Sequence, residues 1–268
     1  MKIGVLGKIS KVKNQQVIDD LVAYLQNLGY ETQLFSSPQE INNVDVVIVL
    51  GGDGAILHSA IPAAKNNVKI IGINYGNLGF LTEYEKNEGE EIAELLSQLQ
   101  AGTCRILKRS ILEVEIAGRT FFALNEVALQ RDSGLTAMKT TQILRVKVQS
   151  QEGTDVISGD GLLLCTPTGS TAYSLSAGGA ILTPEVPVFM LTPVCAFSMR
   201  KRPIVYSDSE EFAFRVMQGN ALLSADGLIL GHLPENATIF VRKAPFTADF
   251  PVRNNSDFFA KVRNKLSE

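Results

Sequence analysis

One tetrapeptide constrains this chain more than any other stretch: Gly-Gly-Asp-Gly at residues 51–54. It follows an apolar, β-branched run at 44–50, which predicts a buried strand of a parallel sheet. Residues 55–60 predict the first turns of a helix. Strand, glycine turn and helix together aim free backbone N–H groups and the helix dipole at an anion. Because glycine lets the main chain approach a ligand closely, the arrangement predicts a phosphate site.

Asp53 is the unexpected member of this tetrapeptide. A carboxylate repels phosphate unless it accepts a proton or helps to hold a metal ion, so Asp53 indicates chemistry as well as binding. The tetrapeptide alone fits equally well an ordinary β–α turn with an aspartate cap. Two better-known phosphate motifs are excluded. The chain has no Gly-x-x-x-x-Gly-Lys-Ser/Thr sequence, and Leu57 and Leu164 stand where a dinucleotide-binding fingerprint needs its third glycine.

The pattern of elements changes along the chain and predicts two domains within its 268 residues. Strand and helix patterns alternate up to residue 102, which predicts a parallel sheet with its ligand crevice at the carboxyl ends of the strands. Pro62 is expected to disturb or end the helix that follows the glycine turn. Residues 103–244 show short alternating strands, one of them at 121–130, and predict a mostly-β domain. An amphipathic helix capped by Ser256 is expected to return to the first domain, which then comprises 1–102 and 245–268.

Composition limits the possible partners. A net charge of −3, with 20% charged residues, gives no electrostatic footprint for nucleic acid or an anionic membrane. The sequence shows no signal-peptide pattern and no apolar stretch near 20 residues. Its three cysteines lie far apart in apolar surroundings, which predicts buried thiols in a reducing, cytoplasmic compartment. With two distant histidines and no nucleophile elbow, hydrolase triads and zinc sites are disfavoured.

Several polar residues in apolar surroundings need a physical reason. Asn125 and Glu126 are adjacent inside an apolar strand pattern, so they point to opposite faces and one of them must find a buried partner. An edge strand with both groups in water is the alternative. Asp160, between two glycines, fits a turn cap or a hydrogen bond to a ribose hydroxyl. Asp226 is most simply a turn aspartate. His58, just after the glycine turn, is placed to reach a phosphate.

A second unusual stretch is Thr-Pro-Thr-Gly-Ser-Thr-Ala-Tyr at 166–173. It follows a strand pattern and predicts a loop that enters a helix of small residues near Ser170. Small hydroxyl-bearing residues at a helix start make a polar site that a ligand can approach closely. A capped helix packed tightly on a sheet explains the same stretch equally well.

Taken together and in this order, these motifs closely resemble the bacterial ATP-NAD kinases, the inorganic polyphosphate/ATP-NAD kinase family. The matching segments are Gly-Gly-Asp-Gly at 51–54, Gly-Phe-Leu-Thr at 79–82, Asn-Glu at 125–126 and the stretch at 166–173. The resemblance continues through 178–179 and 202–204 and covers nearly the whole chain. Phosphofructokinases and diacylglycerol kinases carry glycine–aspartate motifs similar to the first segment, whereas the last is specific.

The resemblance implies a transferase that phosphorylates the adenosine ribose 2′-hydroxyl of NAD to give NADP. It implies ATP as the donor, a divalent metal ion such as Mg²⁺, and a homodimer or homotetramer; polyphosphate as a donor stays open. The dinucleotide would lie between an α/β domain and a β-rich domain. Two other interpretations are weighed against it. A lipid or sugar kinase is disfavoured by the specific stretch at 166–173, and a catalytically silent dinucleotide-binding protein by the presence of Asp53.

Carried over by position, Asp53 would be the general base or metal-orienting group at the 2′-hydroxyl. Tyr173 would lie against a base, and Phe80 would border the adenine. The expected nucleotide contacts are Gly54, His58, Asn74, Phe80, Asn125, Glu126, Ser158, Asp160, Thr171, Ala172, Tyr173, Ser174, Leu175, Ser176 and Asp226. The resemblance assigns no metal ligand.

Three positions depart from the family pattern. Ser158 stands where a basic residue is common, and Leu228 stands where glutamine is frequent. Ala-Phe at 196–197 replaces a common Pro-His pair. These departures affect the expected affinity and substrate preference more than the reaction, because none of them touches Asp53.

Overall fold

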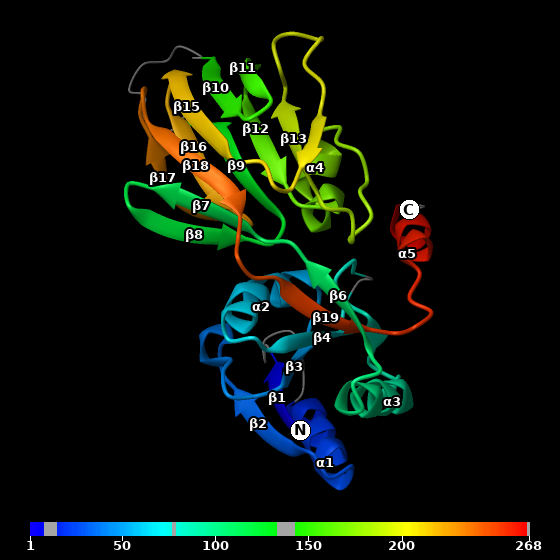
Figure 1. Ribbon diagram of the computed structural model, residues 1–268. Helices are drawn as coiled ribbons and strands as arrows, with labels where there is room; N and C mark the ends of the chain where they lie inside the picture. The colour runs from blue at the N-terminus through cyan, green and yellow to red at the C-terminus, as the bar shows by residue number, and fades with distance from the viewer. Residues whose placement is uncertain (8–14, 77–78, 133–142, 267–268) are drawn as a thin grey trace. The chain divides into compact units, whose positions relative to one another are not determined.

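The computed structural model describes residues 1–7, 15–76, 79–132 and 143–266 (Figure 1). Its contacts divide the chain into unit 1, Met1–Lys108 with Phe246–Glu268, and unit 2, Arg109–Pro245. The sequence put the first boundary at 102/103, because β6 (Arg105–Arg109) has the pattern of the β domain. That strand instead pairs with β19 (Ala248–Val252). The expected fold class is confirmed. It comprises an α/β unit, a mostly-β unit and a C-terminal helix that returns to the α/β unit.

Unit 1 is built on a parallel sheet with strand order β2-β1-β3-β4-β5. Its strands are β1 (Lys2–Gly7), β2 (Glu31–Phe35), β3 (Val46–Leu50), β4 (Lys69–Asn74) and β5 (Tyr84–Glu85). All five side chains of β3 are buried. A strand with both faces covered has no polar alternation, and this is why the sequence before the glycine turn is continuously apolar.

Helices cover both faces of this sheet. α1 (Gln15–Asn27) and α3 (Gly89–Gln100) bury Leu25 and Leu96 in one cluster with Ile71 and Ile73 of β4. Gly72, between those two strand residues, faces the opposite side. There a Cβ on Gly72 would lie 2.2 Å from Ile56 Cδ1 of α2 (Asp53–Lys65), so the missing side chain lets α2 pack close.

Pro62 lies inside the last turn of α2, which continues to Lys65. Of the two outcomes expected for Pro62, the end of the helix at this residue is therefore wrong. So near the end of a helix, proline removes one backbone hydrogen bond and leaves few later residues to be affected. A short 3₁₀ turn, η1 (Pro38–Glu40), lies between β2 and β3.

Unit 2 consists of two six-stranded antiparallel sheets. One sheet orders β11 (Gly153–Gly159), β10 (Leu144–Ser150), β15 (Phe212–Gln218), β18 (Thr238–Lys243), β7 (Leu112–Ile116) and β8 (Arg119–Ala123). The other orders β14 (Ile204–Ser207), β13 (Val188–Val194), β12 (Gly161–Cys165), β9 (Glu126–Arg131), β16 (Ala221–Ala225) and β17 (Leu228–Leu233). Val146 and Phe214 of the first sheet share one buried cluster with Leu129 and Leu164 of the second.

The strand expected at 121–130 is in fact two strands, β8 and β9, that belong to different sheets. The break falls at residues 124–125. Here the carboxylate of Asp226 accepts hydrogen bonds from the backbone N–H groups of Leu124, Asn125 and Glu126, at 2.7, 2.8 and 3.1 Å. These N–H groups are held by a side chain, which lets the chain leave one sheet and enter the other.

Two helix predictions also need correction. No continuous helix begins near Ser170, because a 3₁₀ turn, η2 (Thr168–Thr171), is separated from the single turn α4 (Tyr173–Ser176) by Ala172, whose ψ of −128° is not helical. The C-terminal helix α5 (Phe258–Leu266) is capped by Asp257, whose Oδ1 accepts from the Ala260 N–H at 3.0 Å. The residue expected as its cap, Ser256, donates its hydroxyl to Glu83 at 3.1 Å.

The cysteines are less uniform than expected. Cys165 is buried, Cys104 is half-buried and Cys195 is exposed. Within the described part of the chain, no helix is long and apolar enough to cross a lipid bilayer.

Candidate functional site

One group of candidate site residues lies in unit 1, at the start of α2. Asp53 is the first residue of this helix, and its carboxylate is turned toward the loop at 79–82. Its Oδ2 accepts from the Phe80 N–H at 2.8 Å and its Oδ1 from the Leu81 N–H at 2.9 Å. The ammonium group of Lys265 lies 3.3 Å from Oδ2. Since the side chain of Asp53 is 32% exposed, these contacts orient an acid that a ligand can still reach.

Glycines make this arrangement possible in two different ways. A Cβ on Gly79 would lie 2.1 Å from Asp53 Oδ1, so only glycine lets the loop close on the carboxylate. Cβ atoms on Gly52 or Gly54 would meet no atom within 4 Å. These two residues therefore leave open space beside the first turn of α2, where backbone N–H groups lack intrahelical partners and can bind an anion.

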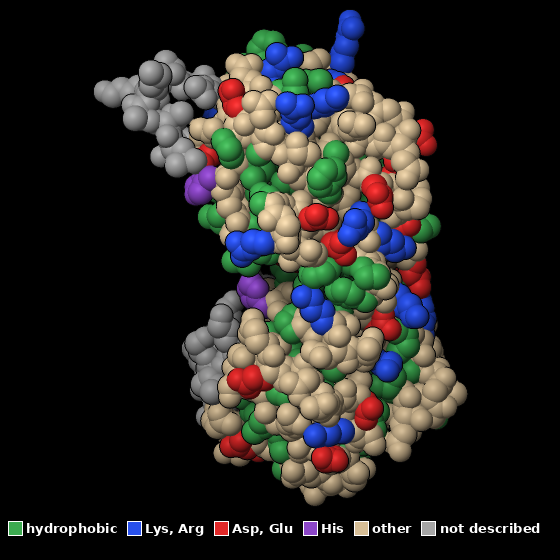
Figure 2. Space-filling model, turned by 60° about the vertical axis from the view of Figure 1, so that its left-hand side comes forward, with side chains coloured by type: hydrophobic (Ala, Val, Ile, Leu, Met, Phe, Trp, Pro, Cys, Tyr) green, Lys and Arg blue, Asp and Glu red, His purple; other side chains and the backbone are tan. Residues whose placement is uncertain are grey.

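His58 lies in a pocket of about 290 Å³ at the carboxyl ends of β1 and β3. The residues that line it are Leu6, Gly7, Ser36, Pro38, Gln39, Val49, Leu50, Ala55 and His58. The imidazole is exposed, and Figure 2 shows both histidines of the chain as purple side chains at the surface. Asp53 is not among the lining residues, so His58 and the carboxylate face different surroundings although they share one helix.

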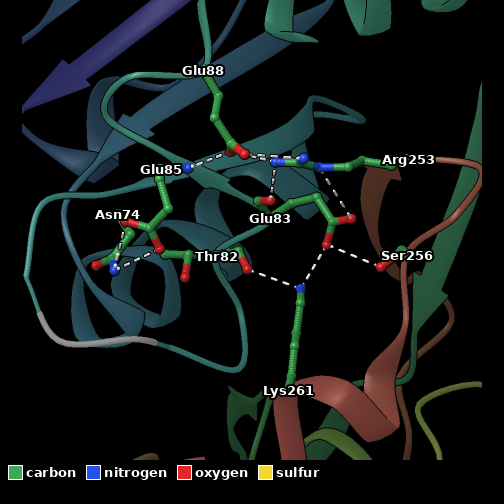
Figure 3. A network of polar contacts seen from close by, with 8 residues as sticks. All are labelled: Asn74, Thr82, Glu83, Glu85, Glu88, Arg253, Ser256 and Lys261. Atoms are coloured by element: carbon green, nitrogen blue, oxygen red, sulfur yellow. Dashed lines mark hydrogen bonds and ion pairs between the residues drawn. The ribbon is translucent and has the colours of Figure 1, made fainter. Parts of the chain in front are cut away.

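Asn74 has a different environment from the one expected of a nucleotide contact. Its side chain is buried and donates to a carboxylate oxygen of Glu85 at 3.1 Å and to the Gly76 carbonyl at 3.2 Å. Its Oδ1 accepts from the Gly76 N–H at 3.0 Å. The amide therefore holds the turn that follows β4, within the polar network of Figure 3. That network continues through Glu88 and Arg253 to Glu83.

A separate group of candidate site residues lies in unit 2, around Asp226. This residue has the positive φ, 49°, of the turn that the sequence predicted. Its carboxylate does more than form the turn, because it holds three successive N–H groups of the segment 124–126. Asp226 thereby fixes Asn125 and Glu126, and the alternative of an edge strand is wrong, because β9 lies between β12 and β16 and Glu126 is buried.

Glu126 is the most unusual residue of the unit 2 group. It is 8% exposed, and within the described residues its Oε2 has no hydrogen-bond partner. Burial, and then the negative charge of Asp226, raise the pKa of Glu126 to about 7, against a smaller lowering by the backbone N–H of Tyr173. A buried acceptor oxygen without a donor is costly, so this oxygen is placed to take a hydrogen bond from a ligand hydroxyl.

The stretch 171–176 divides into ligand-accessible and structural residues. The Tyr173 hydroxyl accepts from Gln130 Nε2 at 2.9 Å, and Thr171 donates its hydroxyl to the Thr168 carbonyl at 3.3 Å. Ser174 is buried and shares a 2.8 Å hydrogen bond with Thr192, so its hydroxyl faces the protein interior. Ser176 is exposed, and the others are half-buried: Thr171, Ala172, Tyr173 and Leu175.

Two expected contacts lie apart from this cluster. In the β9–β12 ladder Cys165 is opposite Glu126, whereas Gly161 is opposite Gln130. Asp160 precedes β12 at its other end, five residues from Cys165, so it lies roughly 16 Å away at about 3.3 Å per residue. It forms an ion pair with Arg131 at 3.3 Å. Ser158 pairs with Arg145 in the β10–β11 ladder and does not join Glu126 either.

Sequence reasoning missed two residues of the unit 1 group. Gly79 was recognised only as part of a motif, because its requirement depends on a carboxylate 26 positions earlier in the chain. Lys265 carried only a weak signal, a basic residue in the last turn of a helix, which ordinarily complements the helix dipole.

The fold defines the class of protein. The structure resembles that of yeast NADH kinase complexed with NADH, with a TM-score of 0.84 at 21% identity over 100% of this chain and 87% of that one. It also resembles an NAD kinase from Archaeoglobus fulgidus in complex with ATP, with a TM-score of 0.80 at 26% identity over 98% and 99% of the two chains. The two units together therefore have the two-domain fold of pyridine-nucleotide kinases.

Sequence comparison then gives the family. Residues 6–103 match the ATP-NAD kinase N-terminal domain and residues 124–251 the ATP-NAD kinase C-terminal domain. The NAD kinase of Methanothermobacter thermautotrophicus is 30% identical over 100% of this chain and 97% of its own length. The NAD kinase of Methanosphaera stadtmanae is 33% identical over 99% of both. The chain belongs to the ATP-NAD kinase family and is an enzyme that phosphorylates NAD with ATP.

Proposed function

We propose that this enzyme transfers the terminal phosphoryl group of ATP to the adenosine ribose 2′-hydroxyl of NAD, with Asp53 as the general base. The observation that carries this assignment is the carboxylate itself. It follows a glycine turn suited to phosphate, and two backbone N–H groups orient it while it stays partly open to solvent. A carboxylate in that position needs a catalytic reason, and accepting a proton from an alcohol supplies one.

The proposed acceptor contacts come from unit 2. The unpartnered Oε2 of Glu126 can accept a hydrogen bond from a hydroxyl of NAD, and the half-buried Asn125 lies beside it. The yeast relative's complex with NADH and the archaeal relative's complex with ATP support these two kinds of ligand. The aromatic ring of Tyr173 would stack against a nucleobase of the dinucleotide. Ser158 and Asp160 would then contact a part of the dinucleotide that is remote from Glu126.

The proposed reaction asks little covalent chemistry of the protein. The hydroxyl oxygen forms a bond to the terminal phosphorus of ATP while the bond from that phosphorus to the bridging oxygen breaks, and ADP leaves with the electron pair. The hydroxyl proton passes to the carboxylate of Asp53. Catalysis then depends on positioning and on neutralising the phosphate charge. The N–H groups at the start of α2 and the dipole of that helix contribute to both.

A divalent metal ion fits this site as a companion of the phosphates. The described residues contain no group of three histidine, cysteine or acidic side chains that could hold a metal ion by themselves. Mg²⁺ ordinarily keeps several waters and binds through one or two carboxylates together with substrate phosphates. Asp53 is the carboxylate that would complete such a site, and the ion when bound would neutralise phosphate charge.

We also propose association into a homodimer or homotetramer in the cytoplasm. Strands β14 and β17 are the edges of one sheet of unit 2 and carry exposed apolar side chains: Ile204, Val205, Leu228 and Ile229. Exposed apolar edge strands are favoured sites of self-association. All three cysteines are free, which agrees with a reducing compartment.

The test is NADP formation by the purified protein from NAD, ATP and magnesium, measured with an NADP-specific dehydrogenase, alongside Asp53→Asn. The wild type should form product, and the variant should keep its fold and much of its NAD affinity but lose most of its turnover. A near-normal rate in Asp53→Asn would remove this residue from the role of base. Absence of product from the folded wild type, with ATP and with polyphosphate, would reject the proposed reaction.

A further inference from the structure

The C-terminal segment of the chain is fixed to the loop that holds Asp53. Lys261 of α5 donates to a carboxylate oxygen of Glu83 at 2.6 Å and to the Thr82 carbonyl at 2.9 Å. Ser256 donates to the same carboxylate, and Arg253 donates to the Glu83 carbonyl at 2.9 Å (Figure 3). Residues 82–83 directly follow Phe80 and Leu81, whose N–H groups bind Asp53. These contacts therefore fix α5 to the loop at 79–82.

The last turn of α5 brings Lys265 to Asp53. The ring of Phe258, at the start of the helix, lies 6.5 Å from the ring of Phe80. One helical turn after Lys261, the ammonium group of Lys265 lies 3.3 Å from Asp53 Oδ2 and 4.3 Å from the centre of the Phe80 ring. A cation is thus held beside the carboxylate and next to the glycine turn.

The two lysines of this helix are held very differently. Lys261 is 22% exposed and is held by two oxygens at 2.6 and 2.9 Å, so it is a structural anchor. Lys265 is 34% exposed, and the ion pair that it forms among the described residues, with Asp53, is long at 3.3 Å. A flexible four-carbon stem allows such an ammonium group to exchange one anionic partner for another.

Phosphoryl transfer would require Lys265 to exchange Asp53 for a phosphate partner. Negative charge on the transferred group must be neutralised, and lysine is a common phosphate ligand. A carboxylate that accepts a proton must also have a free lone pair, which an ammonium group on Oδ2 partly occupies. If the ammonium group moves to the phosphate, both requirements are met in one step.

We infer that Lys265 is a phosphate-binding residue that pairs with Asp53 in the free enzyme and moves to the terminal phosphate of the donor. This inference rests on the proposed function. As the hydroxyl oxygen bonds to phosphorus and ADP departs, Lys265 donates to a non-bridging oxygen of the transferred group. The released Oδ2 of Asp53 takes the hydroxyl proton.

The experiment compares Lys265→Met, Lys265→Arg and the wild type, with Arg263→Met as the control. Arg263 is a cation of the same helix whose side chain is 67% exposed and lies 3.7 Å from Asp257. The control removes one positive charge from α5 and leaves the ion pair between Lys265 and Asp53 in place. Affinities for inorganic tripolyphosphate and for ATP with magnesium are measured by titration calorimetry, and initial rates give kcat and the KM of each substrate.

Lys265→Met should weaken tripolyphosphate and ATP binding by about 10- to 100-fold, the range expected for one lost hydrogen bond from a charged group. Its kcat should fall and its KM for ATP should rise, while the KM for NAD stays unchanged. Lys265→Arg should recover most of the affinity, and Arg263→Met should behave as wild type.

Equal tripolyphosphate affinities in wild type and Lys265→Met would overturn the inference, even if kcat fell, because Lys265 would then only position Asp53. An equal loss in Arg263→Met would also overturn it, since a general charge effect would explain the result. If the wild type formed no NADP, the proposed reaction would fail, yet the tripolyphosphate affinities would still decide whether Lys265 binds phosphate.

Discussion

Replacing Gly79 by alanine tests whether the loop at 79–82 sets the position of the catalytic carboxylate. The added Cβ would lie 2.1 Å from Asp53 Oδ1, 2.8 Å from its Cγ and 2.9 Å from Thr82 Oγ1. Contacts of this kind below 3.0 Å are essentially never observed. The carboxylate must therefore retreat by about 1 Å, and the 2.8 and 2.9 Å bonds to the Phe80 and Leu81 N–H groups would be stretched or lost.

The size of the effect follows from these two bonds. A hydrogen bond to a charged group contributes about 1.5–3 kcal/mol, so the two together set an upper limit of about 3–6 kcal/mol. Water can replace part of this, because the Asp53 side chain is 32% exposed. We therefore expect Gly79→Ala to lower the free energy of unfolding by about 2 kcal/mol and the Tm by about 4–8 °C. A displacement of about 1 Å at a reacting group lowers turnover by about 100-fold.

Gly54→Ala is the matched control, because its Cβ would meet no atom within 4 Å. It should keep or raise the Tm, since alanine favours the helix, yet lower turnover by obstructing the approach of phosphate to the first turn of α2. Differential scanning calorimetry and the NADP assay measure the two effects on each variant. A Gly79→Ala enzyme with the Tm and turnover of the wild type would refute the argument.

Two further predictions concern unit 2. Glu126→Gln should stabilise the protein above pH 7 by up to about 3 kcal/mol and have no such effect below about pH 4.5. The sign follows because the pKa of Glu126 is raised to about 7 from 4.5. The folded state therefore holds a proton that the unfolded state has lost, and wild-type stability falls as pH rises between these values. Urea unfolding of both proteins at pH 5 and pH 8 checks this, and parallel pH dependences would contradict it. Asp226→Ala should lower the free energy of unfolding by about 3 kcal/mol or more and weaken NAD binding, because three N–H groups lose their acceptor. Unfolding and NAD titration of this variant measure both effects, and wild-type values would show that the segment 124–126 holds its shape unaided.

The sequence predicted most of the local structure of unit 1, because strand and helix there have strong, different periodicities. The apolar run before the glycine turn became β3, and the helical spacing after it became α2. It failed where a distant side chain overrides local propensity. The strand pattern at 121–130 gives no sign of a break apart from the polar pair Asn125 and Glu126, and it is the carboxylate of Asp226, about a hundred residues later, that holds the N–H groups where the two strands separate.

The sequence by itself determined the two-domain division, the glycine turn with its exceptional aspartate, and the set of motifs that marks the ATP-NAD kinase family. These are local features, or features of order along the chain, and they do not depend on which segments meet in space. Only the tertiary structure decided which polar groups are occupied and which are available. In the structure the side chains of Asn74 and Ser174 form hydrogen bonds within the protein, and Asp160 lies apart from Glu126. Lys265 lies beside Asp53. The physical reason is that a hydrogen bond or an ion pair depends on distance and burial, and neither can be obtained from spacing in the sequence.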